Sequence, residues 1–185
     1  MDEVIVQGMP ESLRKYVVED CSIPASSFEL MPGELLPDPA RKLMYHYDDM
    51  TSTLAGYYGS KIVIDRIQGV ERDGVYFREV FLRAEKLDAV VEYGVIAIVL
   101  DSFEEEQRKV IEADRVPFGG LLHQFKIEFK STPVCFFAIS AEHLVDTPFK
   151  DLRGHTFYGR FNKLSKQNGQ TLAWIMEILP EEQDG

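Results

Sequence analysis

The segment from residue 155 to 180 constrains the fold most, because it carries the strongest hairpin signal in the chain. Two runs of strand-forming residues flank Asn168-Gly169, a dipeptide that favours a tight turn between antiparallel strands. The second run, residues 171–179, is apolar at almost every position, so both of its faces are expected to be buried. Glu177 is its one charged residue. A buried carboxylate needs a partner, a proton or a ligand, because desolvating it alone is costly.

The composition limits the classes of protein to which this chain can belong. Its 185 residues suit one domain with a sizeable core, in which residues 1–39 show no clear pattern. No apolar run approaches the roughly 20 residues of a membrane span, and the N-terminus does not resemble a secretory signal. The net charge of −11, from 31 acidic and 20 basic residues, argues against nucleic-acid binding. Cys21 and Cys135 are expected to be reduced thiols, and the histidines lack metal-site spacing. We therefore expect a cytoplasmic protein without a metal.

Turn signals and apolar periodicity divide the chain into short elements. Strands are predicted over residues 61–67, 75–82, 89–100, 125–129 and 134–139, in addition to the two strands of the C-terminal hairpin. Helices are predicted over residues 10–18, 40–58 and 102–111, and a tight turn leads into a short helix at 116–122. Residues 23–39 are expected to be irregular because of their four prolines, and 141–153 to form turns or a broken helix. A second hairpin turn at Asp73-Gly74, like the other short connections, implies antiparallel pairing.

Two arginines lie in predicted strands and could serve a carboxylate. Arg78 shares its strand face with apolar residues, so its side chain is expected to point where apolar groups point. An ion pair with Glu79 or Glu92, or a place at the sheet edge, would explain it without a function. Arg160 lies in the first hairpin strand, where a surface position is the simpler interpretation. Because the arginine fork suits carboxylates and a glutamate in an apolar wall can exchange a proton, Glu177 with these arginines suggests a small carboxylate ligand.

Four motifs follow one another along the chain. They are DDM-T at residues 48–51, YFREVFL at 76–82, PFGGLL at 117–122, and YGRFNKL…NGQTLAWIMEILP at 158–180. Their order resembles the chorismate pyruvate-lyase family and its wider group of chorismate-lyase-like proteins, with its D-S-M-T helix, REV-L strand, P-L-G turn and final hairpin. The resemblance implies an α+β fold, with a single antiparallel sheet, helices packed over one face and a site beneath flap-like helical turns. It also implies a cofactor-free reaction that converts chorismate into 4-hydroxybenzoate and pyruvate.

The resemblance assigns roles to particular residues of this sequence. Met50 matches the family's product-contacting methionine, and Phe118 matches the pocket residue that follows the proline. Arg78 matches the carboxylate-binding arginine and would bind the ring carboxylate. Glu177 matches the acidic residue and would handle a proton as the enolpyruvyl group leaves, facing Arg78 across the bound ring. We add Arg160 as a candidate for the second carboxylate of chorismate.

The sequence departs from the family pattern at two places. Phe118 stands where the typical enzyme has leucine, and Tyr93 or its neighbours replace an arginine of the third strand. An alternative function is therefore a non-catalytic domain that binds an aromatic carboxylate, related to effector-binding domains of bacterial transcription regulators. Such domains normally follow a winged helix, for which residues 1–39 are too short and too rich in proline. A scaffolding protein is a third alternative, but it gives Arg78 and Glu177 no purpose.

Overall fold

The computed structural model describes residues 9–144 and 155–180, which form a sheet of seven strands with five α-helices. The helices are α1 (Glu11–Glu19), α2 (Ala40–Met44), α3 (Met50–Tyr58), α4 (Glu105–Glu112) and α5 (Phe118–Gln124). The strands are β1 (Glu29–Met31), β2 (Ile62–Arg72), β3 (Val75–Ala84), β4 (Ala89–Val99), β5 (Lys130–Ser140), β6 (Thr156–Ser165) and β7 (Thr171–Leu179).

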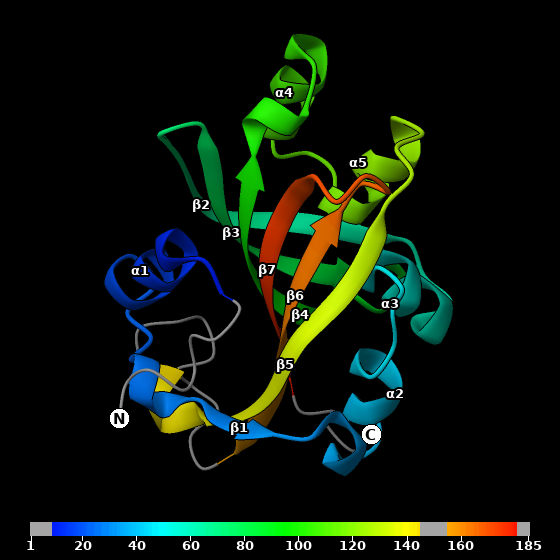
Figure 1. The fold of residues 1–185 in the computed structure, drawn as a ribbon. Helices are drawn as coiled ribbons and strands as arrows, with labels where there is room; N and C mark the ends of the chain where they lie inside the picture. Colours follow the sequence, from blue (N-terminus) through cyan, green and yellow to red (C-terminus); the bar gives the residue numbers. More distant parts are fainter. Residues whose placement is uncertain (1–8, 145–154, 181–185) are drawn as a thin grey trace.

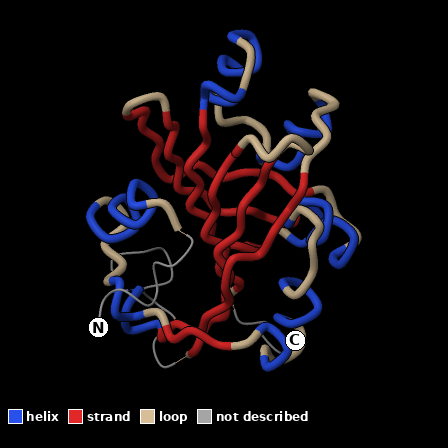
Figure 2. The backbone as a smooth tube through the Cα atoms, viewed as in Figure 1, coloured by secondary structure: helices blue, strands red, loops and turns tan. Residues whose placement is uncertain are grey.

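All seven strands pair antiparallel in the order β1-β5-β6-β7-β4-β3-β2. The sheet runs through the middle of the molecule and the helices lie around it (Figures 1 and 2). β7 is an inner strand between β6 and β4, which explains why both of its faces are apolar. The predicted α+β class with a single antiparallel sheet is confirmed.

Both predicted hairpin turns are present. Asp73 and Gly74 connect β2 to β3 with φ angles of 52° and 78°, a left-handed conformation that aspartate and glycine adopt more readily than other residues. Gly169, with φ of 88°, lies in the turn between β6 and β7. The turn at Gly169 sets the register of β6 and β7, which places Arg160 of β6 opposite Glu177 of β7.

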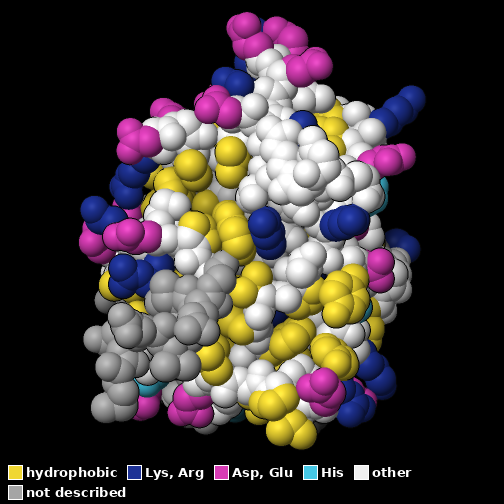
Figure 3. Space-filling model, in the orientation of Figure 1, with side chains coloured by type: hydrophobic (Ala, Val, Ile, Leu, Met, Phe, Trp, Pro, Cys, Tyr) yellow, Lys and Arg dark blue, Asp and Glu magenta, His cyan; other side chains and the backbone are white. Residues whose placement is uncertain are grey.

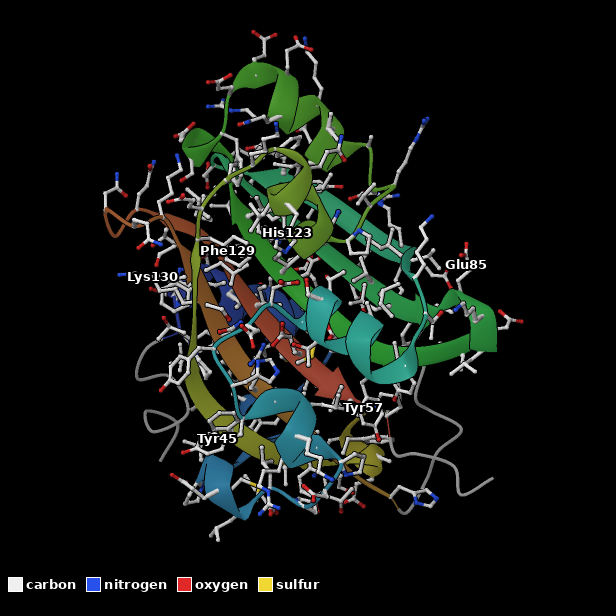
Figure 4. The ribbon with its side chains drawn as sticks, turned by 90° about the vertical axis from the view of Figure 1, so that its right-hand side faces the viewer. Tyr45, Tyr57, Glu85, His123, Phe129 and Lys130 are labelled. Carbon is white, nitrogen blue, oxygen red and sulfur yellow. The ribbon has the colours of Figure 1, made fainter. Side chains whose placement is uncertain are left out.

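Helices cover both faces of the sheet. α1 packs on one face, where the ring of Tyr16 stacks on Phe77 of β3 with 4.8 Å between ring centroids. The helices α2, α3 and α5 lie over the opposite face (Figure 4), where Met50 of α3 packs in the same cluster as Val80 of β3. The expected helical cover of one face is therefore present, and α1 covers part of the other. Arg78 alternates with Phe77 along β3, so it points toward α3 and α5.

The single helix predicted over residues 40–58 is wrong, because the chain breaks between α2 and α3. Tyr47, within the break, is 75 % exposed. Asp49 then caps α3, since its side chain accepts a hydrogen bond from the Ser52 N–H at 2.9 Å. The carbonyl oxygens of Met44 and His46 at the break accept hydrogen bonds from Arg160 instead of from backbone N–H groups of a continuing helix. Helical periodicity in the sequence does not reveal this distant donor.

Three further expectations concern the segments beside the sheet. The strand predicted over residues 125–129 is wrong, because β5 begins only at Lys130 and then continues through Pro133. The β5–β6 register shifts directly after Pro133, a place where a missing N–H is tolerated. The supposedly irregular residues 23–39 contain β1, which pairs with the edge of β5. Of the turns predicted over 141–153, Ala141–Leu144 form a 3₁₀ turn and the others lie outside the described residues.

The acidic run predicted to form a surface helix does so as α4. Figure 3 shows acidic side chains gathered over this helix at the top of the molecule. None of the helices within residues 9–144 and 155–180 has the length and apolar character needed to cross a membrane.

Candidate functional site

A cavity of about 50 Å³ lies between the sheet and the N-terminal ends of α3 and α5. Four of the five predicted site residues line it: Met50 from α3, Arg78 from β3, Phe118 from α5 and Glu177 from β7. These residues come from four separate parts of the sequence. The fold therefore brings the four motifs of the sequence to one place.

The sheet register sets the distance between Arg78 and Glu177. Gly94 of β4 is paired with Val80 of β3 on one side and with Glu177 of β7 on the other. Arg78 lies two residues before Val80, which corresponds to about 7 Å along the strand, and two strand spacings of about 4.8 Å separate β3 from β7. The Cα atoms of Arg78 and Glu177 are thus about 12 Å apart. The two side chains therefore approach the cavity from separate positions on the sheet.

Arg78 is 1 % exposed and is held by the loop that precedes α5. Its Nη1 donates to Asp114 Oδ1 at 3.2 Å and its Nη2 donates to the Val116 carbonyl oxygen at 3.3 Å. Asp114 also accepts from Arg66 Nε at 2.7 Å and from the Tyr76 hydroxyl at 2.5 Å. The Nε of Arg78 has no partner among the described residues. Because two guanidinium groups share one carboxylate, this end of the cavity carries a net positive charge.

The ion pair that the sequence suggested between Arg78 and Glu79 or Glu92 is wrong, because the partner is Asp114. Glu79 points to the opposite face of β3, where it accepts a hydrogen bond from the Tyr93 hydroxyl at 2.5 Å. Since Asp114 lies in a polar loop more than 30 residues further along the chain, nothing in the strand sequence pointed to it.

Glu177 is 2 % exposed and forms an ion pair with Arg160, whose side chain is fully buried. The Nη1 of Arg160 also donates to the carbonyl oxygens of Met44 at 2.9 Å and His46 at 3.1 Å, and its Nη2 donates to that of Asp48 at 3.4 Å. Arg160 therefore joins the hairpin to the break between α2 and α3. The structure does not place Arg160 in the wall of the cavity. Arg160 holds Glu177 in position, and its guanidinium group already donates hydrogen bonds to other groups of the protein.

Glu92 of β4 is a cavity residue for which the sequence suggested only a structural role. It is 3 % exposed, and its Oε2 has no hydrogen-bond partner among the residues that the structure describes. Burial raises the pKa of Glu92 well above its ordinary value of 4.5, the charge of Glu177 raises it further, and Arg160 lowers it. The signal that identified Glu177, a lone charge in an apolar strand, applies equally to Glu92 in β4.

The roof of the cavity is made where α3 and α5 meet. A Cβ atom at Gly119 would lie 2.5 Å from Asp49 Oδ1, so the glycine lets the two helix ends touch. His123 on α5 lies over this junction (Figure 4), with its Nε2 at 3.1 Å from Asp49 Oδ2 and 3.3 Å from Ser52 Oγ. The His123 side chain is 58 % exposed. The contact is partly buried, because the Asp49 side chain is only 8 % exposed.

No protein-family model matches the sequence, and no curated protein matches it. Within the described residues, no cluster of three or more His, Cys, Asp and Glu side chains could hold a metal ion. The functional interpretation is therefore based on the cavity and on the four sequence motifs.

Proposed function

We propose that this protein is a chorismate lyase-like enzyme that eliminates pyruvate from chorismate and releases 4-hydroxybenzoate. The supporting observation is that Arg78 and Glu177 line the same cavity, with Met50 and Phe118 beside them. These are the residues to which the sequence resemblance assigned the ligand. The positive charge at the Arg78 end suits a ring carboxylate, because the guanidinium fork matches carboxylate geometry.

The proposed reaction needs positioning and one proton transfer. Arg78 binds the ring carboxylate, and Met50 and Phe118 pack against the two sides of the ring. The carboxylate of Glu177 takes the proton from the ring carbon that bears the hydroxyl group. The bond from the neighbouring ring carbon to the enolpyruvyl oxygen then breaks, its electron pair leaves with that oxygen, and the ring becomes aromatic. The proton passes to the released enolpyruvate, which becomes pyruvate. Aromatisation drives the reaction, so the protein mainly orients the substrate and excludes water.

Substrate entry requires the roof to open. A cavity of about 50 Å³ is smaller than the roughly 150 Å³ that hold a benzene ring in an engineered protein cavity. The ends of α3 and α5 form the outer wall of the cavity, and the contact of His123 with Asp49 joins them. The proposal therefore includes separation of these two helix ends before the ring enters.

The direct test is to incubate the purified protein with chorismate and to identify the products against authentic standards. Arg78→Met should lower kcat/KM at least about 100-fold, because it removes a buried charged partner of the substrate. Its fold should persist, since Asp114 keeps Arg66 and Tyr76 as partners. Arg83→Met is the matched control, because Arg83 lies on the same strand but bonds Asp65 at the surface. Unchanged turnover in Arg78→Met would refute the assignment.

A non-catalytic domain that binds aromatic carboxylates is the second candidate. One observation favours it: Arg78 is the single Lys or Arg among the described residues that line the cavity, whereas chorismate carries two carboxylates. Calorimetry with 4-hydroxybenzoate, run beside the chorismate assay, separates the two candidates. Pyruvate and 4-hydroxybenzoate formed from chorismate support the lyase, and tight binding without turnover supports the binding domain.

A further inference from the structure

The cavity contains a second buried carboxyl group that the proposed reaction does not use. Glu92 extends from β4 into the cavity and is 3 % exposed, yet its Oε2 has no partner within the described part of the chain. A buried oxygen without a hydrogen bond destabilises the folded protein. The rest of β4 beside it is almost entirely apolar, so an apolar side chain would suit the strand better.

Gly94 makes room for the Glu92 carboxyl group. A Cβ atom at Gly94 would lie 3.2 Å from Glu92 Oε1, closer than most real Cβ contacts. Gly94 is also the residue directly opposite Glu177 in the β4–β7 pairing. The Glu92 carboxyl group therefore folds over Gly94 toward Glu177, and the two carboxyl groups lie at the same end of the cavity. Arg78 is at the other end.

Burial raises the pKa of Glu92 most, and the charged groups around it modify that effect. The groups that act on it are Glu177 across Gly94, Arg160 behind Glu177, and Asp49 at the end of α3. Arg160 forms an ion pair with Glu177 and lowers the pKa of Glu92, so it offsets part of the effect of Glu177. Burial and Glu177 still raise the pKa of Glu92 well above its ordinary value, which favours the protonated form that can donate a hydrogen bond.

We propose that Glu92 is a ligand-contacting residue that selects a hydroxyl group in the para position of the bound ring. With the ring carboxylate on Arg78, the para substituent reaches the end of the cavity where Glu177 and Glu92 meet. A hydroxyl group there donates its hydrogen to the Glu177 carboxylate and accepts one from Glu92. An amino group is a poor acceptor and can satisfy only Glu177. This inference rests on the proposed function, because it takes from it the orientation of the ring.

The test compares three ligands by isothermal titration calorimetry: 4-hydroxybenzoate, 4-aminobenzoate and benzoate. The wild-type protein should bind 4-hydroxybenzoate about tenfold more tightly than 4-aminobenzoate, the value of one well-made hydrogen bond. Glu92→Met should remove most of that preference and leave benzoate affinity within about twofold, because benzoate has nothing to accept the Glu92 proton. Glu92→Gln should retain the preference to within about threefold, because its amide is also a neutral donor.

Glu79→Gln serves as the control, because Glu79 is buried on the neighbouring strand but faces away from the cavity. It should leave the order of the three ligands unchanged. The proposal is overturned if Glu92→Met weakens benzoate and 4-hydroxybenzoate equally, or changes neither. The chorismate assay distinguishes failure of the Glu92 proposal from failure of the proposed lyase function. Loss of the hydroxyl preference in Glu92→Met without any wild-type turnover leaves Glu92 as proposed and refutes the lyase. Turnover with no role for Glu92 does the opposite. A wild-type protein that binds none of the three ligands overturns the Glu92 proposal, and the chorismate assay still decides the lyase.

Discussion

Replacing Glu177 by glutamine should change the ionisation of Glu92, and the change can be measured as protein stability. In the wild-type protein Arg160 has Glu177 as its counter-ion, and the charge of Glu177 helps to keep Glu92 neutral. In Glu177→Gln the buried Arg160 has lost that counter-ion. Glu92 is the neighbouring acid, and Arg160 already acts to lower its pKa. We therefore expect Glu92 to ionise in this variant and to balance the charge of Arg160.

The magnitude follows from the burial of the pair. Breaking a fully buried ion pair by removing one partner costs about 3–5 kcal/mol, because the other charge is left uncompensated. Arg160 is 0 % exposed and Glu177 is 2 % exposed, so the full range applies when no substitute counter-ion exists. With Glu92 as substitute, Glu177→Gln should cost only about 1–3 kcal/mol, and the complete cost should appear in Glu177→Gln/Glu92→Gln. Glu92→Gln alone should stabilise the otherwise wild-type protein at neutral pH, because folding must protonate Glu92, which is ionised in the unfolded chain, whereas glutamine needs no proton.

Urea unfolding of the four proteins at neutral pH gives the double-mutant cycle. The expected result is that Glu92→Gln is more destabilising by about 2 kcal/mol in the Glu177→Gln background than in the wild-type background. An equal effect of Glu92→Gln in both backgrounds, within about 0.5 kcal/mol, would refute the coupling of the two carboxyl groups through Arg160.

Two further predictions use the same stability measurement. Because the pKa of Glu92 is raised on folding, the folded state binds more protons than the unfolded state above pH 4.5. Wild-type stability should therefore fall relative to that of Glu92→Gln as pH rises, by up to about 1.4 kcal/mol per pH unit until the folded pKa is passed. A stability difference that stays constant from acid to neutral pH would contradict a raised pKa. Gly159→Ala should destabilise the protein by about 1–3 kcal/mol or more, because its Cβ would overlap the ring of Phe137 and come 2.5 Å from the Glu177 carbonyl oxygen. The control Gly56→Ala, whose Cβ on α3 meets nothing within 4 Å, should be neutral or stabilising. Thermal unfolding compares the two variants, and equal melting temperatures would contradict the tight packing of β6 against β7.

Local signals in the sequence predicted the parts of the fold that local forces determine. Asn168-Gly169 and Asp73-Gly74 both lie in the turns they indicated, and the uninterrupted apolar run of β7 indicated an inner strand. The helix over residues 40–58 failed for a non-local reason. Arg160, more than 100 residues away, donates to carbonyl oxygens at the break and so stabilises a non-helical path. Such a donor overrides helix propensity, which is worth only tenths of a kcal/mol per residue.

The candidate site also contains features that local sequence signals predicted and features that distant contacts determine. Arg78 and Glu177 were identifiable because each is a charge in an apolar strand, and Glu92 shows the same pattern. The two partners differ in how far the sequence determines them. Arg160 lies opposite Glu177 in the register that the Asn168-Gly169 turn sets, so counting along the hairpin pairs them. Asp114 reaches Arg78 from a loop, and no local pattern in the sequence places that loop beside β3.

The polar groups at the two ends of the cavity do not contribute to the stability of the folded protein. The Nε of Arg78 and the Oε2 of Glu92 are both buried and lack partners among the described residues, at a cost of about 1–3 kcal/mol each. Gly94 adds a further cost of about 0.5–1 kcal/mol in the interior of a strand, and it leaves space for Oε1 of the Glu92 carboxyl group. A single occupant with a carboxylate at one end and a hydroxyl group at the other would complete the hydrogen bonding at both ends. The groups that lack hydrogen-bond partners within the described residues are therefore those that the proposed ligand would bind.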